Sequence, residues 1–564
     1  MEQDVWEPVL PLVSSPARYT DHEWNARRKP MAQAAVRALL LYPDCYEQGA
    51  SDYGLSVAYH AVNNHPDFAA DRAFLPWPDM RQAMRARGLR LFGLESRERV
   101  AGMHVVFLFM PSAISFAAIP MLMSLAGVPL VAAERGDNDP IVIGLGPASA
   151  NPEPAAEFLD AVLLGDLEYA PPEICGAIAE QSRAPRDERL ARLAGIEGVY
   201  VPAFYSSAPG RGAQPAHPGA SPIVRFRTAP LEEATFPAEP VVPFVATRLE
   251  SAQVEIARGC ACRSALCPHR CRSGAARARP AEQVARLALH TLDRTGYDAL
   301  TLFGSDGLRP DETAGVVSEC LAALGEQRVR VRVPSLPASH IGAVSALGLP
   351  ALDVELGPAS DRLRTMLELQ GMEEIKASVE GAVAAGARNV CLHITIGMPG
   401  ETEEDVRQAG LHINELSRLG RLPAGRARGL RLAAEIHAFF PEPHTPGQWF
   451  GTLPVEVMRG RLATMRETVG RRVQLRLPSP EEVVLAACLA RAGREMSGAL
   501  RAIITDGENS LDPGALVEAL QRAGVDVERE ACRRLDPRDR LPWDHLQYAA
   551  SREELEAAAG MVGL

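Results

Sequence analysis

The sequence predicts an α/β protein in which a doubly wound, Rossmann-like sheet is followed by a partial (β/α)6 TIM-like barrel and a helical C-terminal region. Three observations support this prediction. Apolar runs alternate with helical stretches from about residue 35 to 170, six strand-like runs recur after residue 252, and the residues from Glu481 onward have a helical pattern. We therefore expect an N-terminal α/β domain over residues 1–202, a linker over 203–250, the barrel over 251–475 and the helical region over 476–564.

The first sheet is predicted from apolar runs that each end at a Gly, Pro or Asp loop. These runs are VRALLLYPD, VVFLFM, PIVIGLG and AVLLGD. Continuous apolar runs are typical of parallel strands that are buried on both faces. Ligands of doubly wound sheets bind at the carboxyl ends of the strands, so we expect site loops at residues 43–54, 110–115 and 144–154.

One uncharged segment, Val105–Ala133, is long enough to span a bilayer. Pro111, Pro120 and Pro129 divide it, so we interpret it as a buried strand, a loop and a helix. The first residues lack a signal-peptide pattern, and a net charge of −12 does not favour general nucleic-acid binding. We expect a cytoplasmic protein with reduced, dispersed cysteines and no membrane partner.

The barrel is predicted from a second series of strand-like runs. A Gly-, Pro-, Ala- and Ser-rich stretch at 203–222 precedes it and is typical of a flexible excursion. The runs are QVEIARG, YDALTLFG, RVRVRVPSL, ALDVELG, NVCLHITIGMPG and RLAAEIHAFFP, with helical stretches between most of them. Chemistry in such barrels takes place at the carboxyl ends of the strands.

Four of the ten cysteines crowd into a short segment directly after the first of these strands. They are Cys260, Cys262, Cys267 and Cys271. Thiolates gathered on one loop suit a soft metal centre, usually an iron–sulfur cluster or zinc. A loop at the carboxyl end of a barrel strand is also where a site is expected.

The chain resembles the radical S-adenosylmethionine enzymes that carry an N-terminal cobalamin (B12)-binding-type domain. The likeness runs through ARYTDHEWNA, FLPWPDM, LFGLESR, AAERGDNDP, NPEPAAEFLDAV, GMPGETEEDV, PEPHTPGQW and LPWDHL, in one order along the chain. It implies a [4Fe–4S] cluster held by three cysteines spaced C-x3-C-x2-C. The amino and carboxylate groups of S-adenosylmethionine would chelate the open iron, and an electron from the cluster would cleave the sulfonium to give a 5′-deoxyadenosyl radical. The resemblance further implies a small-molecule or peptide substrate and an electron donor such as ferredoxin or flavodoxin.

The cysteine spacing departs from that pattern. Counted from Cys260, the second ligand position is Ser264 and the third is Cys267. Aligned instead on the RCRSG end of the loop, the third position is Cys271. An open cluster on Cys260, Cys267 and Cys271 is one interpretation. A closed four-cysteine cluster for electron transfer or scaffolding is a second, and a loop that binds zinc or no metal is a third.

The resemblance also implies the residues that contact S-adenosylmethionine. Gly304 and Ser305 in FGSDG would lie beside its methionine part, and Glu355 would face its ribose or amino group. Arg364 would bind a carboxylate of the cofactor or substrate. A salt bridge on a helix surface is the alternative for Arg364. Gly397 and Pro399 would shape a turn near the adenine. Thr402, three residues before Asp405, is expected to cap the next helix. His437 and His444 lack metal-ligand spacing, so we expect both to be structural.

Cobalamin binding is left open by the sequence. Loops around Tyr46, Gly49 and Gly54, and around Gly144 and Gly146, offer small residues where a corrin and its nucleotide tail would lie. The domain lacks the Asp-x-His-x-x-Gly signature, so no histidine from that motif is expected on cobalt. With cobalamin, the resemblance implies methyl transfer to carbon. Without it, hydrogen abstraction followed by rearrangement or oxidation is expected.

Overall fold

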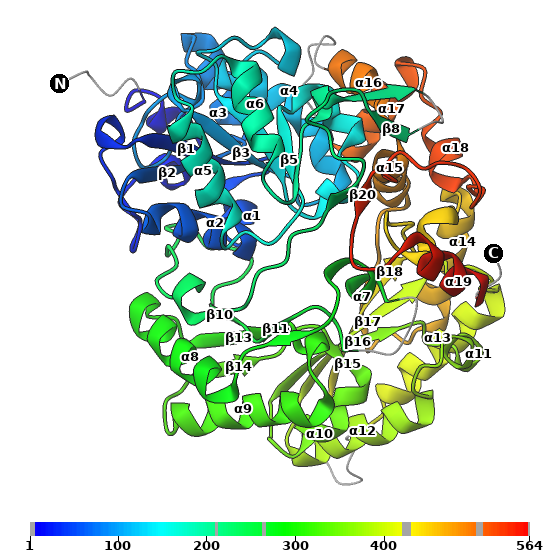
Figure 1. Ribbon diagram of the computed structural model, residues 1–564. Helices are drawn as coiled ribbons and strands as arrows, with labels where there is room; N and C mark the ends of the chain where they lie inside the picture. Colours follow the sequence, from blue (N-terminus) through cyan, green and yellow to red (C-terminus); the bar gives the residue numbers. More distant parts are fainter. Residues whose placement is uncertain (1–5, 209–211, 262–266, 420–429, 504–510, 562–564) are drawn as a thin grey trace. The chain divides into compact units, whose positions relative to one another are not determined.

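The computed structural model describes residues 6–208, 212–261, 267–419, 430–503 and 511–561 (Figure 1). Its contacts divide the chain into two compact units. Unit 1 comprises Met1–Glu250, Leu489–Asp526 and Asp539–Gln547, and unit 2 comprises Ser251–Cys488, Val527–Arg538 and Tyr548–Leu564. The C-terminal residues are therefore shared between the units, an arrangement that a helical sequence pattern does not reveal.

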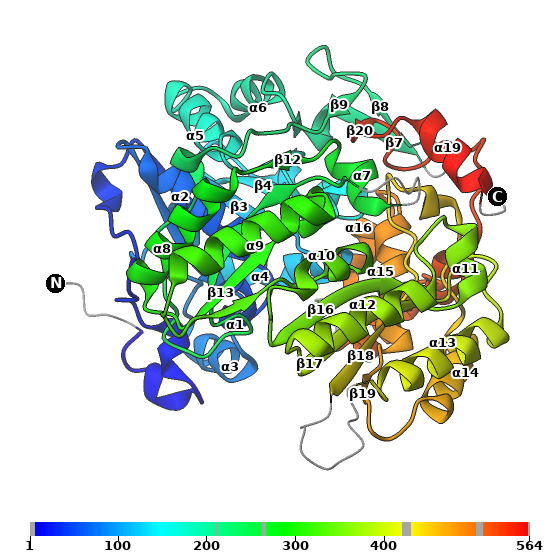
Figure 2. The same ribbon diagram turned by 90° about the horizontal axis from the view of Figure 1, so that it is seen from below.

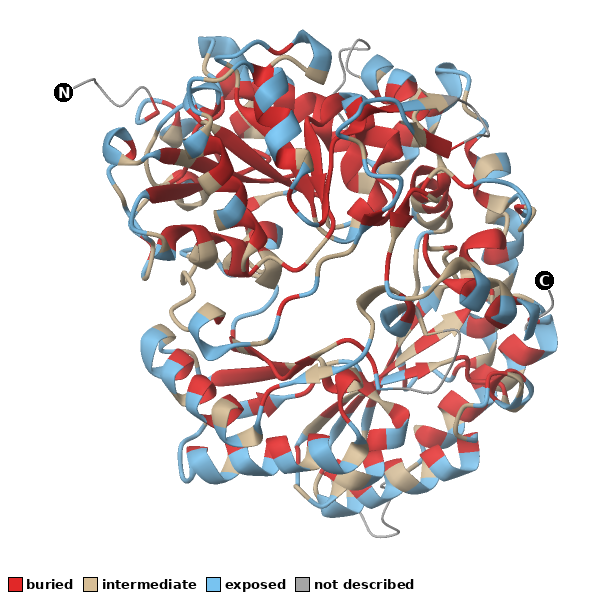
Figure 3. Cartoon of the chain, in the orientation of Figure 1, coloured by how far each residue is buried: buried red, intermediate tan, exposed pale blue. Residues whose placement is uncertain are grey.

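Unit 1 is built on a six-stranded sheet of order β2-β1-β3-β4-β5-β6. Every neighbouring pair is parallel except β5 and β6. The strands are β1 (Val36–Tyr42), β2 (Phe68–Phe74), β3 (Val105–Phe109), β4 (Ile141–Leu145), β5 (Ala161–Leu163) and β6 (Val199–Tyr200). Figure 3 shows these strands buried, as expected for a parallel sheet covered on both faces.

The strand order locates the ligand edge of this sheet. An order of 2-1-3-4-5 reverses direction between β1 and β3, and ligands of such folds bind at the carboxyl ends beside that point. The loops at residues 43–54 and 110–115 follow these two strands. Helices of unit 1 are α1 (Tyr46–Gly49), α2 (Tyr53–Asn64), α3 (Pro78–Arg87), α4 (Ile119–Ala126), α5 (Ala170–Glu180), α6 (Arg186–Ala194), α16 (Met496–Ala502) and α17 (Pro513–Arg522).

Strand β2 was not predicted from the sequence, because its sequence, FAADRAF, contains two charged residues. Both are buried: Asp71 accepts hydrogen bonds from the backbone of Glu95 at 2.8 Å and Ser96 at 2.9 Å. The Arg72 guanidinium pairs with Glu95 at 2.6 Å and also with Glu23. These partners lie far from β2 in the sequence, and they satisfy the buried charges of Asp71 and Arg72. From the sequence alone, the two charges favour a surface loop.

The uncharged segment Val105–Ala133 forms strand β3, a 3-10 turn at Ala113–Ala118 and helix α4, which confirms its interpretation as buried α/β structure. None of the helices in the described part of the chain has both the length and the apolar character needed to cross a membrane.

The stretch expected to be a flexible excursion contains an antiparallel pair, β7 (Tyr205–Ala208) and β8 (Gly212–Pro215). Tyr205 and Ala213 in this pair are buried, so the stretch contributes apolar side chains to the packing despite its composition. Nearby, β9 (Val224–Arg225) pairs with β20 (Leu546–Gln547) from the C-terminal residues of the same unit.

Unit 2 contains two parallel sheets, of order β10-β13-β14 and β15-β16-β17-β18-β19, and β14 contacts β16. The strands are β10 (Ala252–Glu255), β13 (Ala299–Phe303), β14 (Arg330–Arg332), β15 (Leu336–Pro337), β16 (Ala351–Gly357), β17 (Asn389–Ile396), β18 (Arg431–Ala438) and β19 (Gln474–Arg476). Helices of this unit are α7 (Pro268–Ser273), α8 (Ala281–Thr295), α9 (Pro310–Leu324), α10 (Ile341–Ser345), α11 (Asp361–Met366), α12 (Met372–Ala385), α13 (Glu403–Leu416), α14 (Val455–Thr468), α18 (Val527–Cys532) and α19 (Arg552–Met561), while α15 (Pro480–Arg491) crosses the boundary between the units.

The two faces of the five-stranded sheet differ in chemistry. Figure 2 shows α12 and α13 lying along β16–β18, and every second residue of these strands, such as Val354, Leu392 and Ile436, is buried. The residues between them face the other way and are more exposed. We call this second face the polar face; it carries Asp353, Glu355, Cys391, His393, Thr395, Glu435 and His437.

The buried charges of β2 give a first prediction. Arg72→Ala would leave the carboxylates of Glu23 and Glu95 buried without their cation. We expect the free energy of unfolding to fall by about 3–5 kcal/mol, measured by urea unfolding. Arg85→Ala, at an exposed position on α3, should change it by no more than about 0.5 kcal/mol. Equal effects of the two variants would contradict this role for Arg72.

Candidate functional site

The cysteine loop of unit 2 brings thiols from separate positions together. Cys260 follows β11 (Ala257–Arg258), while Cys267 immediately precedes α7. Their sulfur atoms lie 3.4 Å apart. Cys271, one turn into α7, is buried, and its backbone N–H donates to the carbonyl of Cys267. Cys262 and Ser264 lie outside the described residues.

The loop is closed at its base by backbone pairing. Strand β11 runs antiparallel to β12 (Arg277–Ala278), with Ala257 opposite Ala278. Gly259 has φ +88°, and a Cβ atom there would lie 2.7 Å from the carbonyl oxygen of Ala275. Glycine is therefore needed just before Cys260, where the two ends of the loop meet.

The FGSDG turn after β13 supports the same loop. Gly304 has φ +88°, and a Cβ atom there would lie 2.0 Å from the carbonyl oxygen of Ala257. The backbone N–H of Ala261 donates to the carbonyl of Asp306 at 2.9 Å. The structure thus packs Gly304 against the backbone that leads into Cys260. Ser305 is 1% exposed, and its hydroxyl has no hydrogen-bond partner in the described part of the chain.

A cavity of about 430 Å³ adjoins the loop. Cys267 lines it together with residues at the carboxyl ends of β16, β17 and β18, among them Pro358, Thr395 and Phe439. The rest of its wall is mainly apolar and includes Met366, Leu367, Leu369, Met398, Pro399, Phe440 and Phe450. A volume and lining of this kind suit one small organic ligand.

The GMPGET turn shapes one wall of this cavity. Gly397 has φ +81° and donates its N–H to the carboxylate of Glu401 at 2.6 Å. Met398 and Pro399 thereby face the cavity. Thr402 caps α13 and forms a reciprocal capping box with Asp405, which confirms that prediction.

Arg364 and Glu355 lie in different surroundings. Arg364 is 2% exposed and donates to the backbone carbonyls of Leu356 and Pro358 at 2.6 and 2.8 Å. Burial lowers its pKa to about 10. Its guanidinium therefore hydrogen-bonds the backbone of the loop after β16. Among the described residues it takes part in no salt bridge on a helix surface. Glu355 is an exposed residue of the polar face, but neighbouring protein atoms partly desolvate its carboxyl group and this raises its pKa.

The polar face also pairs His437, which the sequence led us to expect as structural, with His393, which sequence analysis missed. His393 hydrogen-bonds Asp353 at 2.6 Å and His437 at 3.0 Å. The bond to Asp353 raises the pKa of His393 to about 10, whereas burial lowers that of His437. The signal was present as polar residues at every second position of three strands. His444 lies elsewhere, buried against Tyr548.

The residues expected to hold cobalamin in unit 1 are mostly packed against the protein itself. Tyr46 is 2% exposed and bonds Glu23 through its hydroxyl. A Cβ atom at Gly49 would lie 2.5 Å from Phe74, and one at Gly144 would lie 2.7 Å from Met110. A Cβ atom at Gly54 would lie 3.1 Å from Asp52 Oδ1. A Cβ atom at Gly146 would lie 3.0 Å from the backbone oxygen of Met110. A side chain at any of these glycines would therefore meet the protein's own atoms.

Comparison with known proteins identifies part of the chain. Residues 54–202, within unit 1, match the family of radical SAM proteins, N-terminal. The chain therefore carries the N-terminal domain of radical S-adenosylmethionine proteins. This confirms the family predicted from the sequence. No functionally curated protein is a detectable sequence relative of the chain.

One solved structure shares the fold, and a second gives a lower score. The radical S-adenosylmethionine methyltransferase TsrM from Kitasatospora setae, with cobalamin and a [4Fe–4S] cluster bound, has a TM-score of 0.51 and 14% identity; the match covers 87% of this chain and 100% of that one. The cobalamin-dependent S-adenosylmethionine radical enzyme OxsB has a TM-score of 0.46 and 9% identity over 67% of this chain and 52% of its own. At this identity the likeness to TsrM shows the mixed α/β fold alone.

The contact beneath the cysteine loop gives a second prediction. Gly304→Ala would place a Cβ against the carbonyl of Ala257 and force a positive φ on alanine, so we expect a loss of about 1–3 kcal/mol in unfolding free energy. Iron bound after reconstitution should fall with it. Gly315→Ala in α9, where a Cβ meets no atom within 4 Å, should keep the iron and lose no stability. Full iron content in Gly304→Ala would contradict the supporting role.

Proposed function

We propose that this protein binds a [4Fe–4S] cluster on its cysteine loop and reductively cleaves S-adenosylmethionine. The observation that carries the proposal is the position of Cys267, whose sulfur lies 3.4 Å from that of Cys260 while its side chain also lines the cavity of about 430 Å³. A thiol-rich donor set suits iron–sulfur chemistry. The family of the N-terminal domain supports the same assignment.

Such a cluster, when bound, supplies the electron that cleaves S-adenosylmethionine into methionine and a 5′-deoxyadenosyl radical. We assign Cys260, Cys267 and Cys271 as its ligands, an arrangement that leaves one iron open. The cavity wall of Phe439, Phe440 and Phe450 would exclude water from a reactive radical.

We further assign the residues predicted from the sequence to the ligand; of these, Pro399 lines the cavity. Ser305 offers a buried hydroxyl that makes no hydrogen bond within the described residues, next to the turn that holds the loop. Glu355 offers a carboxylate at the end of β16 for a ribose hydroxyl or an amino group. Gly397 and Pro399 would shape the adenine end. Gly304 and Arg364 would act indirectly, by holding the backbone that carries the lining residues.

The wider setting of the reaction is part of the proposal. We infer that the two parallel sheets of unit 2 together form the partial barrel, because β14 contacts β16 and the cavity opens at strand carboxyl ends. The nine described cysteines are all free thiols, which is typical of a reducing compartment such as the cytoplasm. A small molecule or peptide would be the substrate, and a ferredoxin or flavodoxin the electron donor.

The third prediction tests cleavage directly. Protein reconstituted without oxygen and reduced with dithionite should form 5′-deoxyadenosine from S-adenosylmethionine, measured by liquid chromatography and mass spectrometry. Cys267→Ala should abolish the product, because it removes a ligand. A wild-type protein with full iron content and no 5′-deoxyadenosine would contradict the proposal and favour a closed, non-catalytic cluster for electron transfer or scaffolding.

Iron content separates an open cluster from a closed one. If three cysteines hold the cluster, Cys262→Ala should keep full iron and still form 5′-deoxyadenosine, whereas Cys260→Ala and Cys271→Ala should each lose iron. Loss of iron in Cys262→Ala would instead show that the fourth cysteine is a ligand. Zinc in place of iron after anaerobic purification would point to a structural site.

Cobalamin-dependent methyl transfer to carbon is the second candidate function. One observation favours it: the strand order of unit 1 creates a ligand edge beside β1 and β3. The protein's own atoms lie close to the glycines that were expected to hold cobalamin. We therefore assign no residue a contact with cobalamin. Hydroxocobalamin that co-elutes with the protein on gel filtration would support this candidate. Complete separation of the two would remove it.

A further inference from the structure

The polar face of the β15–β19 sheet carries a compact group of side chains that the proposed reaction does not use. His393 lies on β17, while Glu435 and His437 lie on β18. In the register of the two strands His393 stands opposite Glu435, and Thr395 stands opposite His437. Residues two apart on a strand share a face, so all three side chains project to the same side.

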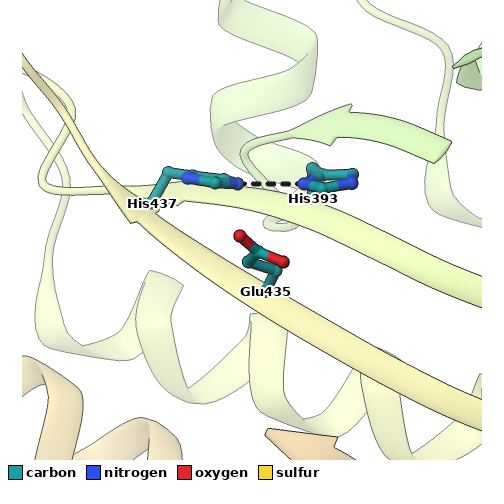
Figure 4. Close-up of side chains that lie close together, drawn as sticks. All are labelled: His393, Glu435 and His437. Carbon is teal, nitrogen blue, oxygen red and sulfur yellow. Dashed lines mark hydrogen bonds between the residues drawn. The ribbon is translucent and has the colours of Figure 1, made fainter. Parts of the chain in front are cut away.

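The donor atoms of these residues converge. One atom from each of His393, Glu435 and His437 lies within 4.8 Å of the other two. Figure 4 shows the two imidazole rings edge to edge, joined by a hydrogen bond, with the Glu435 carboxylate beside them. The bond joins His393 Nδ1 to His437 Nε2 at 3.0 Å.

Asp353 holds His393 in a characteristic way. It hydrogen-bonds Nε2 of His393 at 2.6 Å, so Nδ1 is the nitrogen that faces the group. Histidines that bind metals almost always donate their other N–H to a carboxylate or carbonyl in this manner, which fixes the tautomer and the ring orientation.

The charge around the group also suits a cation. Asp353, Glu355 and Glu435 place three carboxylates on this part of the polar face. Arg476 reaches Glu435 at 3.3 Å, but its side chain is 58% exposed, so solvent weakens the ion pair. His393 and His437 are themselves only partly buried, which leaves a path for an ion to enter.

We propose that His393, Glu435 and His437 form a binding site for a divalent transition-metal ion such as Zn²⁺. Two imidazole nitrogens and one carboxylate are a common zinc ligand set, and this set leaves a coordination position open. The ion replaces the proton shared between the two rings, and that proton passes to solvent. Thr395, opposite His437, lines the cavity described above, so the metal site adjoins it.

The fourth prediction measures the metal itself. Cluster-loaded protein, whose loop cysteines are occupied by iron, is equilibrated with zinc, passed through gel filtration and analysed for zinc and iron. We expect about one zinc per chain in the wild type and its loss in His393→Ala and His437→Ala. His290→Ala, at an exposed position on α8, is the matched control and should keep the zinc. Unchanged iron in every variant shows that each remains folded.

The ligands and the role of Asp353 are tested separately. X-ray absorption at the zinc edge should show only nitrogen and oxygen neighbours at about 2.0–2.2 Å, whereas zinc on the cysteine loop would show sulfur at about 2.3 Å. Asp353→Asn should weaken zinc binding by about 10–100-fold while the ligands remain.

Wild-type protein that retains no more zinc than His393→Ala would overturn the proposal and leave the histidines as a hydrogen-bonded pair. Sulfur-bound zinc that is insensitive to His393→Ala would overturn it equally. Neither measurement includes S-adenosylmethionine, so this result is independent of whether the protein cleaves that molecule.

Discussion

The site of unit 2 depends on one close backbone contact, that of Gly304 against Ala257. A side chain at position 304 would collide with the carbonyl of Ala257, so only glycine allows the turn after β13 to reach the strand that leads into Cys260. The backbone bond from Ala261 to Asp306 extends the contact past the first cysteine. The thiols are therefore held by the sheet and not by the loop alone, and Cys267 reaches the cavity from a fixed base.

A second constraint is that the two faces of the β15–β19 sheet carry different side chains, apolar on one face and polar on the other. Strands β16, β17 and β18 bury aliphatic side chains on the face along which α12 and α13 lie, and this burial fixes their register. The register in turn sets which polar groups meet on the other face. His393 and His437 are 44 residues apart in sequence, yet their nitrogens are 3.0 Å apart. The apolar layer thus determines the chemistry on the opposite side.

The sequence predicted what is local and apolar. Strands β1, β3 and β4 were evident because each is a continuous apolar run, and the cap formed by Thr402 and Asp405 was evident because its spacing is short. Strand β2 was missed because the partners of Arg72, Glu23 and Glu95, are remote in sequence. Gly144 suggested room for a ligand, but a glycine can equally make room for a neighbour, here Met110. His393 and Glu435 were missed and His437 was expected to be structural, because the three residues come together only across neighbouring strands.

We propose that the cysteine loop holds a cluster with an open iron that faces the cavity. Electron paramagnetic resonance of the reduced protein tests this most directly, because chelation at an open iron changes the spectrum of the cluster itself. We expect added S-adenosylmethionine to shift the g-values of the cluster in the wild-type protein. The Cys262→Ala variant should show the same shift. A spectrum unchanged by saturating S-adenosylmethionine in a fully loaded protein would contradict it.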